Sequence, residues 1–192
     1  MLKSLILASA SPRRQELLNQ IGLKFITDPS DIDEDMPATA DFGNLVAELA
    51  LRKALAVSGK YENGIIIGAD TIVVLDNEIF GKPADRSCAR KMLSRLSGCW
   101  HSVFTGVALV DAATSHSINQ FEESQVKFKN LTESEIQNYI DSGEPMDKAG
   151  AYGIQGKGAL FVEKICGDYY NIVGLPLFRL NNMLKSFGIN LL

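Results

Sequence analysis

The chain has 192 residues, 46% hydrophobic and 22% charged, a composition typical of one soluble globular domain. Its formal net charge of −4 argues against a nucleic-acid-binding protein, because such proteins usually carry a basic surplus. Three cysteines without a close pair and two histidines argue against a zinc cage and favour reduced thiols.

The first half of the chain is predicted to alternate strands with helices. Residues 5–8 form an apolar strand too short for a secretory signal or a membrane span, which favours a cytoplasmic protein without membrane segments. Ser11 can cap a helix that has Pro12 at its first position and ends at Gly22. We further predict a strand at 23–26, a helix at 44–58 and an apolar strand at 65–75.

The second half is predicted to contain a long hairpin. Its strands are residues 102–110 and 117–128, and a helix at 85–96 precedes them. Thr132 and Glu135 have the spacing of a capping box that opens another helix. Strands at 160–165 and 170–173 and a helix at 176–187 complete the chain. This order predicts an α/β fold, a mixed twisted sheet flanked by helices, in a single domain over residues 1–192.

A turn rich in hydroxyl and guanidinium groups separates the first strand from the first helix. Ser9, Ser11, Arg13 and Arg14 lie at the helix N-terminus, where backbone amides and the helix dipole attract phosphate. The alternative interpretation is a capped helix with two solvent-exposed arginines. The turn is therefore a candidate phosphate site.

Asp70 interrupts the apolar strand at 65–75. A carboxylate there is costly to bury unless it is paired or binds a cation. Gly68, just before it, allows another group to approach the backbone closely. We predict a metal ligand or general base, and the alternative is a structural aspartate whose charge is satisfied.

The glycine-rich stretch 150–158 matches neither a P-loop nor a dinucleotide-binding fingerprint. If it lines a pocket, the amide of Gln155 can donate to and accept from a base edge; otherwise the glycines serve turns alone. Four other charged residues are individually typical of a solvated surface, but together they offer cations for a triphosphate and carboxylates for Mg²⁺ or Mn²⁺. They are Lys53, Lys82, Glu34 and Glu122.

Several motifs in order resemble the Maf family of nucleotide pyrophosphatases, also described as septum-formation inhibitor-like proteins. The resemblance covers essentially the whole chain and implies a fold like that of the inosine triphosphate pyrophosphatases, with two lobes around a central cleft. The motifs are LASASPRR from Leu7, the EDMP segment from Glu34, GADTIVV from Gly68, GKP from Gly81, TGV from Thr105, EESQVKF from Glu122 and SGEPMDKAGAYGIQGKGALFVEKICGDYYNIVGLPL from Ser142.

The resemblance implies hydrolysis of a nucleoside triphosphate to the monophosphate and pyrophosphate with a divalent cation, Mg²⁺ or Mn²⁺. It makes Asp70 the proton acceptor and matches Glu34 to a position in the family's cleft, and we hypothesise that Glu34 and Asp70 help to hold the metal ion. Arg13, Thr71 and Gln155 resemble the subgroup acting on dTTP and UTP, and a homodimer is implied. We hypothesise that the triphosphate is held by Ser9, Ser11, Arg13, Arg14, Lys53 and Lys82.

Two other functions are weighed against this one. The first is a non-catalytic nucleotide-binding regulator of septum formation, which would bind dTTP without releasing pyrophosphate. The second keeps the reaction but changes the substrate to 7-methyl-GTP, the nucleotide of the sister subgroup.

Overall fold

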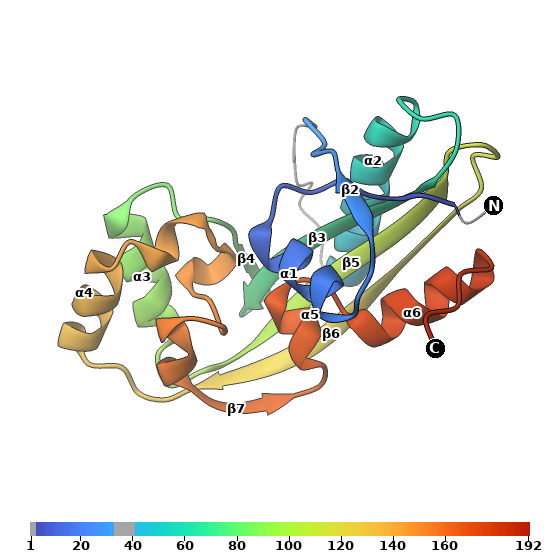
Figure 1. The fold of residues 1–192 in the computed structure, drawn as a ribbon. Helices are drawn as coiled ribbons and strands as arrows, with labels where there is room; N and C mark the ends of the chain where they lie inside the picture. The colour runs from blue at the N-terminus through green and yellow to red at the C-terminus, as the bar shows by residue number, and fades with distance from the viewer. Residues whose placement is uncertain (1–2, 33–40) are drawn as a thin grey trace. The chain divides into compact units, whose positions relative to one another are not determined.

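The computed structural model describes residues 3–32 and 41–192, and Glu34 of the predicted metal site lies outside them. None of the described helices is both long and apolar enough to cross a membrane. The main elements in chain order (Figure 1) are β1 (Leu5–Leu7), α1 (Pro12–Gln20), β2 (Phe25–Thr27), α2 (Phe42–Ser58), β3 (Ile65–Leu75), β4 (Glu78–Phe80), α3 (Arg86–Leu96), β5 (Trp100–Asp111), β6 (Ser117–Phe128), α4 (Glu133–Asp141), β7 (Val162–Cys166), α5 (Tyr169–Val173) and α6 (Leu177–Ser186). Three 3-10 turns lie between α4 and β7: η1 (Glu144–Asp147), η2 (Ala149–Ala151) and η3 (Lys157–Phe161).

The described strands form one mixed sheet of seven. Their order is β2-β1-β3-β5-β6-β7, with β4 paired to β3. Strand β1 runs parallel to both β2 and β3, whereas β4 is antiparallel to β3 and β7 is antiparallel to β6. The prediction of a mixed α/β fold is confirmed.

Two strand predictions near the C-terminus differ from the structure. Residues 170–173, predicted as a strand, belong to helix α5, because Asp168 turns the chain there. The Oδ1 of Asp168 accepts from the backbone N–H of Tyr170 (2.8 Å), a side-chain cap that favours a helical turn. The strand predicted at 160–165 begins only at Val162, after the 3-10 turn η3.

Strand β4 was not predicted from the sequence. It follows the turn at Asp76 and Asn77, both of which have positive φ angles (50° and 64°). Two consecutive left-handed residues match the twist of a tight hairpin, so β3 continues directly into its antiparallel partner.

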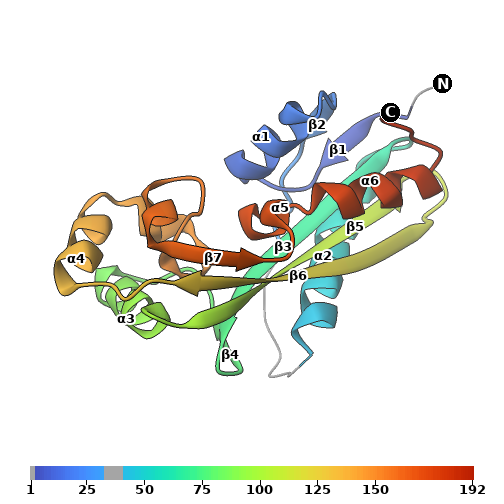
Figure 2. The ribbon, with the colours of Figure 1, turned by 90° about the horizontal axis from the view of Figure 1, so that it is seen from below.

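Contacts divide the fold into two compact units, and the first comprises Met1–Asp70, Thr105–Glu122 and Gly174–Leu192. In unit 1, α2 and α6 cover opposite faces of the strands (Figure 2). The ring of Phe121 on β6 meets Gly43 of α2, whereas the next residue, Glu122, pairs with Arg179 of α6. Neighbouring side chains of a strand point to opposite faces, which agrees with this arrangement. A buried core of Ile6, Ala8, Ala50, Ala54, Val57, Ile66, Ala108 and Val110 lies between α2 and the strands.

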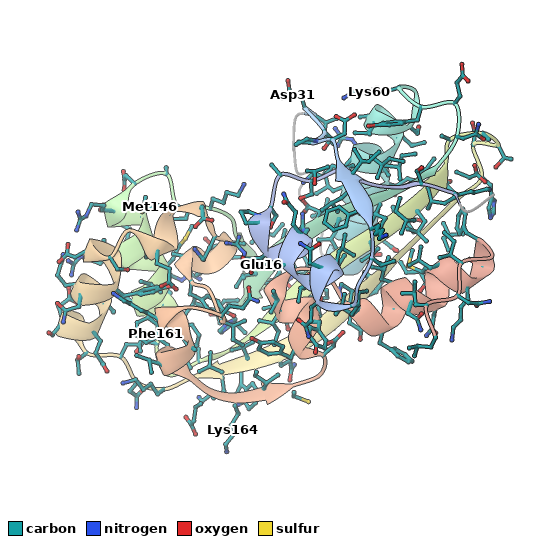
Figure 3. The ribbon with its side chains drawn as sticks, viewed as in Figure 1. Glu16, Asp31, Lys60, Met146, Phe161 and Lys164 are labelled. Atoms are coloured by element: carbon teal, nitrogen blue, oxygen red, sulfur yellow. The ribbon has the colours of Figure 1, made fainter. Side chains whose placement is uncertain are left out.

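Unit 2 comprises Thr71–Phe104 and Glu123–Val173. Its interior is an aromatic cluster in which rings meet edge to face, the geometry that ring quadrupoles favour. Phe128 contacts His101, Tyr152 and Phe161 at centroid distances of 4.9, 4.7 and 5.9 Å. Phe161, labelled in Figure 3, also meets Tyr139 at 4.9 Å. The capping box predicted at Thr132 and Glu135 is present and opens α4.

Candidate functional site

The turn between β1 and α1 is organised around the hydroxyl of Ser9. Its Oγ accepts from Nη1 of Arg14 (3.0 Å) and from the backbone N–H of Ser11 (3.3 Å). Both Ser9 and Arg14 are buried. The alternative of two solvent-exposed arginines is therefore wrong for Arg14, while Arg13 is half-buried.

Arg14 ties this turn to two distant parts of unit 1. Its Nε donates to the carbonyl of Gly174 (2.8 Å), and its Nη1 also donates to the carbonyl of Ala69 (2.9 Å). Ala69 directly precedes Asp70, so the guanidinium joins the turn to the strand that carries the predicted base. These bonds give Arg14 a positioning role, and its phosphate contact stays a prediction.

Ser11 occupies the N-cap position of α1, as predicted, with an extended backbone conformation. Its side chain makes no capping hydrogen bond, however. Pro12 follows at the first helical position, where the missing N–H costs nothing. The hydroxyl of Ser11 is thus not committed to capping the helix.

Lys53 and Asp70 form a buried ion pair. The Nζ of Lys53 lies 2.5 Å from Oδ1 of Asp70, and the two residues are 8% and 7% exposed. The ammonium compensates a carboxylate that would otherwise be costly to bury within an apolar strand. Two residues predicted separately from the sequence therefore meet in unit 1.

Helix α2 brings Lys53 to Asp70 because glycine allows a very close approach. A Cβ atom at Gly68 would lie 2.1 Å from the carbonyl oxygen of Ala50, and one at Gly106 would lie 2.0 Å from that of Val46. The helix backbone thus packs directly on β3 and β5. The group that approaches Gly68 is α2, which presents Lys53 one turn after Val46–Ala50.

Unit 2 contains the other three predicted substrate residues. Thr71 is half-buried on β3, and Lys82 and Gln155 are exposed on loops. The backbone N–H of Gly150 donates to the carbonyl of Gly81 (3.1 Å), so the loop of Lys82 is bonded to the glycine-rich stretch. The weaker candidate Glu122 lies in unit 1, where Arg179 pairs with it (2.6 Å).

The described residues contain no group of three or more His, Cys, Asp or Glu side chains that could hold a metal ion. Asp70 provides one carboxylate, and Glu34 lies outside the described part of the chain. Mg²⁺ is commonly bound by one or two carboxylates together with substrate phosphates and water. This donor chemistry fits an ion that binds together with the phosphates of a nucleotide.

Two residues of unit 2 without a predicted role, Tyr139 and Glu144, organise the glycine-rich stretch. The carboxylate of Glu144 accepts from the backbone N–H groups of Lys157 (3.0 Å) and Gly158 (3.3 Å), and Tyr139 accepts from that of Gly153 (3.0 Å). The partners are 13 and 14 residues apart and lie in separate turns and helices, so no periodicity within one element could signal these contacts.

Comparison with known proteins shows the family to which the sequence belongs. The sequence matches the Maf-like protein family over residues 4–187. This chain belongs to the Maf family. Among its Maf relatives, a protein of Symbiobacterium thermophilum named dTTP/UTP pyrophosphatase is 54% identical over 97% of this chain and 95% of the relative. Proteins of the same name from Clostridioides difficile (50% identity, 98% and 97% coverage) and Dictyoglomus turgidum (51%, 100% of both) are similar over their full lengths.

Proposed function

We propose that this Maf protein is a pyrophosphatase that hydrolyses dTTP and UTP to the monophosphate and pyrophosphate. The observation that carries the proposal is similarity at about half of all positions, over essentially the full length, to relatives named for this activity. The buried Lys53–Asp70 pair and the Ser9–Arg14 turn support it, because they supply an acid–base group and cations within unit 1.

The reaction assigns a proton-transfer role to Asp70. In this proposal the carboxylate of Asp70, whose Oδ1 accepts from Nζ of Lys53, takes a proton from the attacking water. The water oxygen forms a bond to the α phosphorus while the bond from that phosphorus to the bridging oxygen breaks, and pyrophosphate leaves. Positioning and charge neutralisation contribute most of the rate in phosphoryl transfer.

The remaining predicted residues bind the nucleotide in this proposal. In unit 1, Ser9, Ser11 and Arg13 contact phosphate oxygens, with Lys53 as a further cation and Arg14 holding the turn in shape. In unit 2, Lys82 supplies another cation. Thr71 and Gln155 read the pyrimidine edge, and this polar readout discriminates between bases because a wrong base leaves a polar group of the complex without its hydrogen-bond partner.

We also propose that the reaction needs Mg²⁺ or Mn²⁺, which Asp70 and Glu34 would help to hold. When bound, such an ion would supply charge neutralisation for the transferred and leaving groups. The support is the oxygen chemistry of Asp70, which suits a hard divalent cation. Removing divalent ions with EDTA should abolish turnover of dTTP, and adding back Mg²⁺ or Mn²⁺ should restore it; turnover that persists in EDTA would contradict the requirement.

The deciding experiment measures pyrophosphate release by the purified protein from a nucleotide panel containing dTTP, UTP and 7-methyl-GTP. Release that is fastest with dTTP and UTP supports the proposal. Binding of dTTP without release would favour the non-catalytic regulator of septum formation, and fastest release from 7-methyl-GTP would favour the sister subgroup. The Asp70→Asn variant, purified in parallel, shows whether a contaminating enzyme contributes.

A cytoplasmic location and a homodimer belong to the same proposal. The three cysteines, Cys88, Cys99 and Cys166, are all free thiols, which suits a reducing compartment. The dimer is supported by the family resemblance alone, and light scattering of the eluting protein would show either twice the 20.9 kDa chain mass or a monomer.

A further inference from the structure

Glu144, at the start of η1, holds three hydrogen-bond donors with one carboxylate. Its Oε1 accepts from the hydroxyl of Tyr139 (2.9 Å) and from the backbone N–H of Gly158 (3.3 Å). Its Oε2 accepts from the backbone N–H of Lys157 (3.0 Å). Hydrogen bonds that involve an ionised acceptor are about twice as strong as neutral ones. We therefore call the Glu144 carboxylate the anchor, because it holds Tyr139 and the backbone of Lys157 and Gly158 in place.

The anchor reaches both ends of the loop that carries Gln155. Glu144 binds the C-terminal end directly, through Lys157 and Gly158. The N-terminal end of the loop is bound through Tyr139. Its hydroxyl donates to Glu144 and accepts from the backbone N–H of Gly153 (3.0 Å). Tyr139 is only 4% exposed, and its ring is fixed against Phe161. Gln155 therefore lies between two backbone points that one pair of side chains holds.

The glycines of this loop allow the close contact with Glu144. A Cβ atom at Gly156 would lie 2.3 Å from Oε1 of Glu144, and one at Gly158 would lie 2.6 Å from the carbonyl oxygen of Gly153. The Nζ of Lys148 donates to the backbone carbonyl of Glu144 (2.6 Å), which fixes the anchor from its other side. Any side chain at Gly156 would displace the carboxylate.

Gln155 itself is exposed, so packing does not set the direction of its amide. Recognition by hydrogen bonds needs the recognising group held within about 0.5 Å of its working position. For an exposed glutamine on a short loop, the backbone fixes the point from which the side chain reaches the base, and the bonds to the base then complete the orientation of the amide.

We propose that Glu144 is a positioning residue for base recognition, acting through the backbone of residues 153–158 to present Gln155 to the pyrimidine edge. This inference rests on the proposed function, in which Gln155 reads the base. On this inference, replacing Glu144 changes the discrimination between substrates and has only a small effect on the rate of the chemical step, in which Asp70 takes the proton.

The test compares dTTP with dCTP, two pyrimidines that differ in their polar edges. Glu144→Gln keeps the size of the side chain but turns one acceptor into a donor that faces a backbone N–H. We expect the ratio of kcat/KM for dTTP to that for dCTP to fall about tenfold, as one charge-assisted bond is lost. Tyr139→Phe should lower the same ratio by a smaller factor. Glu163→Gln, the same chemical change at an exposed position of β7, is the matched control and should keep it.

This ratio does not depend on the fraction of folded enzyme, because that fraction cancels. It therefore separates positioning from simple destabilisation. A Glu144→Gln enzyme that loses kcat/KM equally for dTTP and dCTP would overturn the inference. So would a variant that keeps the wild-type ratio while amide exchange at Lys157 and Gly158 speeds up.

If the proposed function is wrong, the wild-type protein releases no pyrophosphate from dTTP or UTP, an outcome that differs from those above. Calorimetry then supplies the same comparison as a ratio of Kd values for dTTP and dCTP in wild type and Glu144→Gln. An unchanged Kd ratio overturns the positioning role, and a tenfold loss of preference supports it.

Discussion

The ammonium of Lys53 lies 2.5 Å from the carboxylate of Asp70, and both groups are buried in unit 1. Helix α2 and strand β3 contribute one partner each, 17 residues apart in the chain. The pair makes Asp70 tolerable in an apolar strand and also sets a cation beside the proposed base. Its two partners can be tested separately.

Asp70→Asn should lower turnover per folded enzyme by about two to four orders of magnitude, the usual contribution of a general base, while dTTP still binds. It should also lower the free energy of unfolding, because the Lys53 ammonium then lacks its carboxylate, so the rate is compared at temperatures where the variant is folded. The amide has nearly the same shape as the carboxylate but accepts a proton poorly. Pyrophosphate release measures the rate and calorimetry measures binding. Asp76→Asn, in the β3–β4 turn where asparagine tolerates the left-handed backbone, should retain full activity. Full activity in Asp70→Asn would refute the assignment of the base.

Lys53→Met should destabilise the protein by about 3–5 kcal/mol, because it leaves the Asp70 carboxylate buried without its cation. Urea unfolding followed by circular dichroism measures the loss. Adding Asp70→Asn to Lys53→Met should recover much of it, since the uncompensated charge is then gone. Lys60→Met is the control: it removes the exposed ion pair with Asp28 and should leave the urea concentration at the midpoint of unfolding nearly unchanged. If the double variant is no more stable than Lys53→Met, the pair is not a charge-compensating unit.

Gly68→Ala should lower the free energy of unfolding by about 1–3 kcal/mol or more, because the new methyl group meets the carbonyl of Ala50 at 2.1 Å. The helix must move away from β3, and Lys53 moves with it. Gly59→Ala, at the end of the same helix with no heavy atom within 4 Å, should be neutral or slightly stabilising. Equal midpoints for the two variants in urea would mean that α2 does not pack directly on β3.

Lowering the pH should destabilise the protein through His101, and this effect begins well above the pH at which carboxylates protonate. Burial lowers the pKa of His101 from 6.5 to about 4, so the folded state keeps it neutral while the unfolded state binds a proton. The free energy of unfolding should therefore fall as the pH drops from about 6.5 to about 4, by about 3 kcal/mol in total. The hydrogen bond to Lys129 lowers the pKa of Glu135 to about 2, so its contribution is lost only at pH values below its ordinary 4.5.

Urea unfolding at a series of pH values checks this dependence. His101→Gln should flatten the curve between pH 6.5 and 4, because the buried titrating group is gone. His116→Gln, at the exposed second histidine, should leave the slope in place. A slope that survives His101→Gln would assign the effect to another group.

Local features of the sequence predicted most of the elements. The capping box at Thr132 and Glu135, the apolar run of β3 and the periodicity of α2 each involve neighbours along the chain, and the structure confirms all three. The error at residues 170–173 has a local cause as well. Their apolar pattern suits a short strand or a buried helix, and the side chain of Asp168 decides for the helix.

The sequence by itself determined that a carboxylate at position 70 must be paired or bind a cation if it is buried, because the cost of burial depends on the local residue types. It also predicted, from the amides at a helix N-terminus, that the turn after β1 suits phosphate. Only the tertiary structure decided that the cation is Lys53, that Arg14 is buried between Ala69 and Gly174, and that Glu144 anchors the Gln155 loop. These contacts join residues 13 to 160 positions apart, and no period of a helix or strand encodes such separations. They arise when α2 packs on Gly68 and when the glycine-rich stretch folds around one carboxylate.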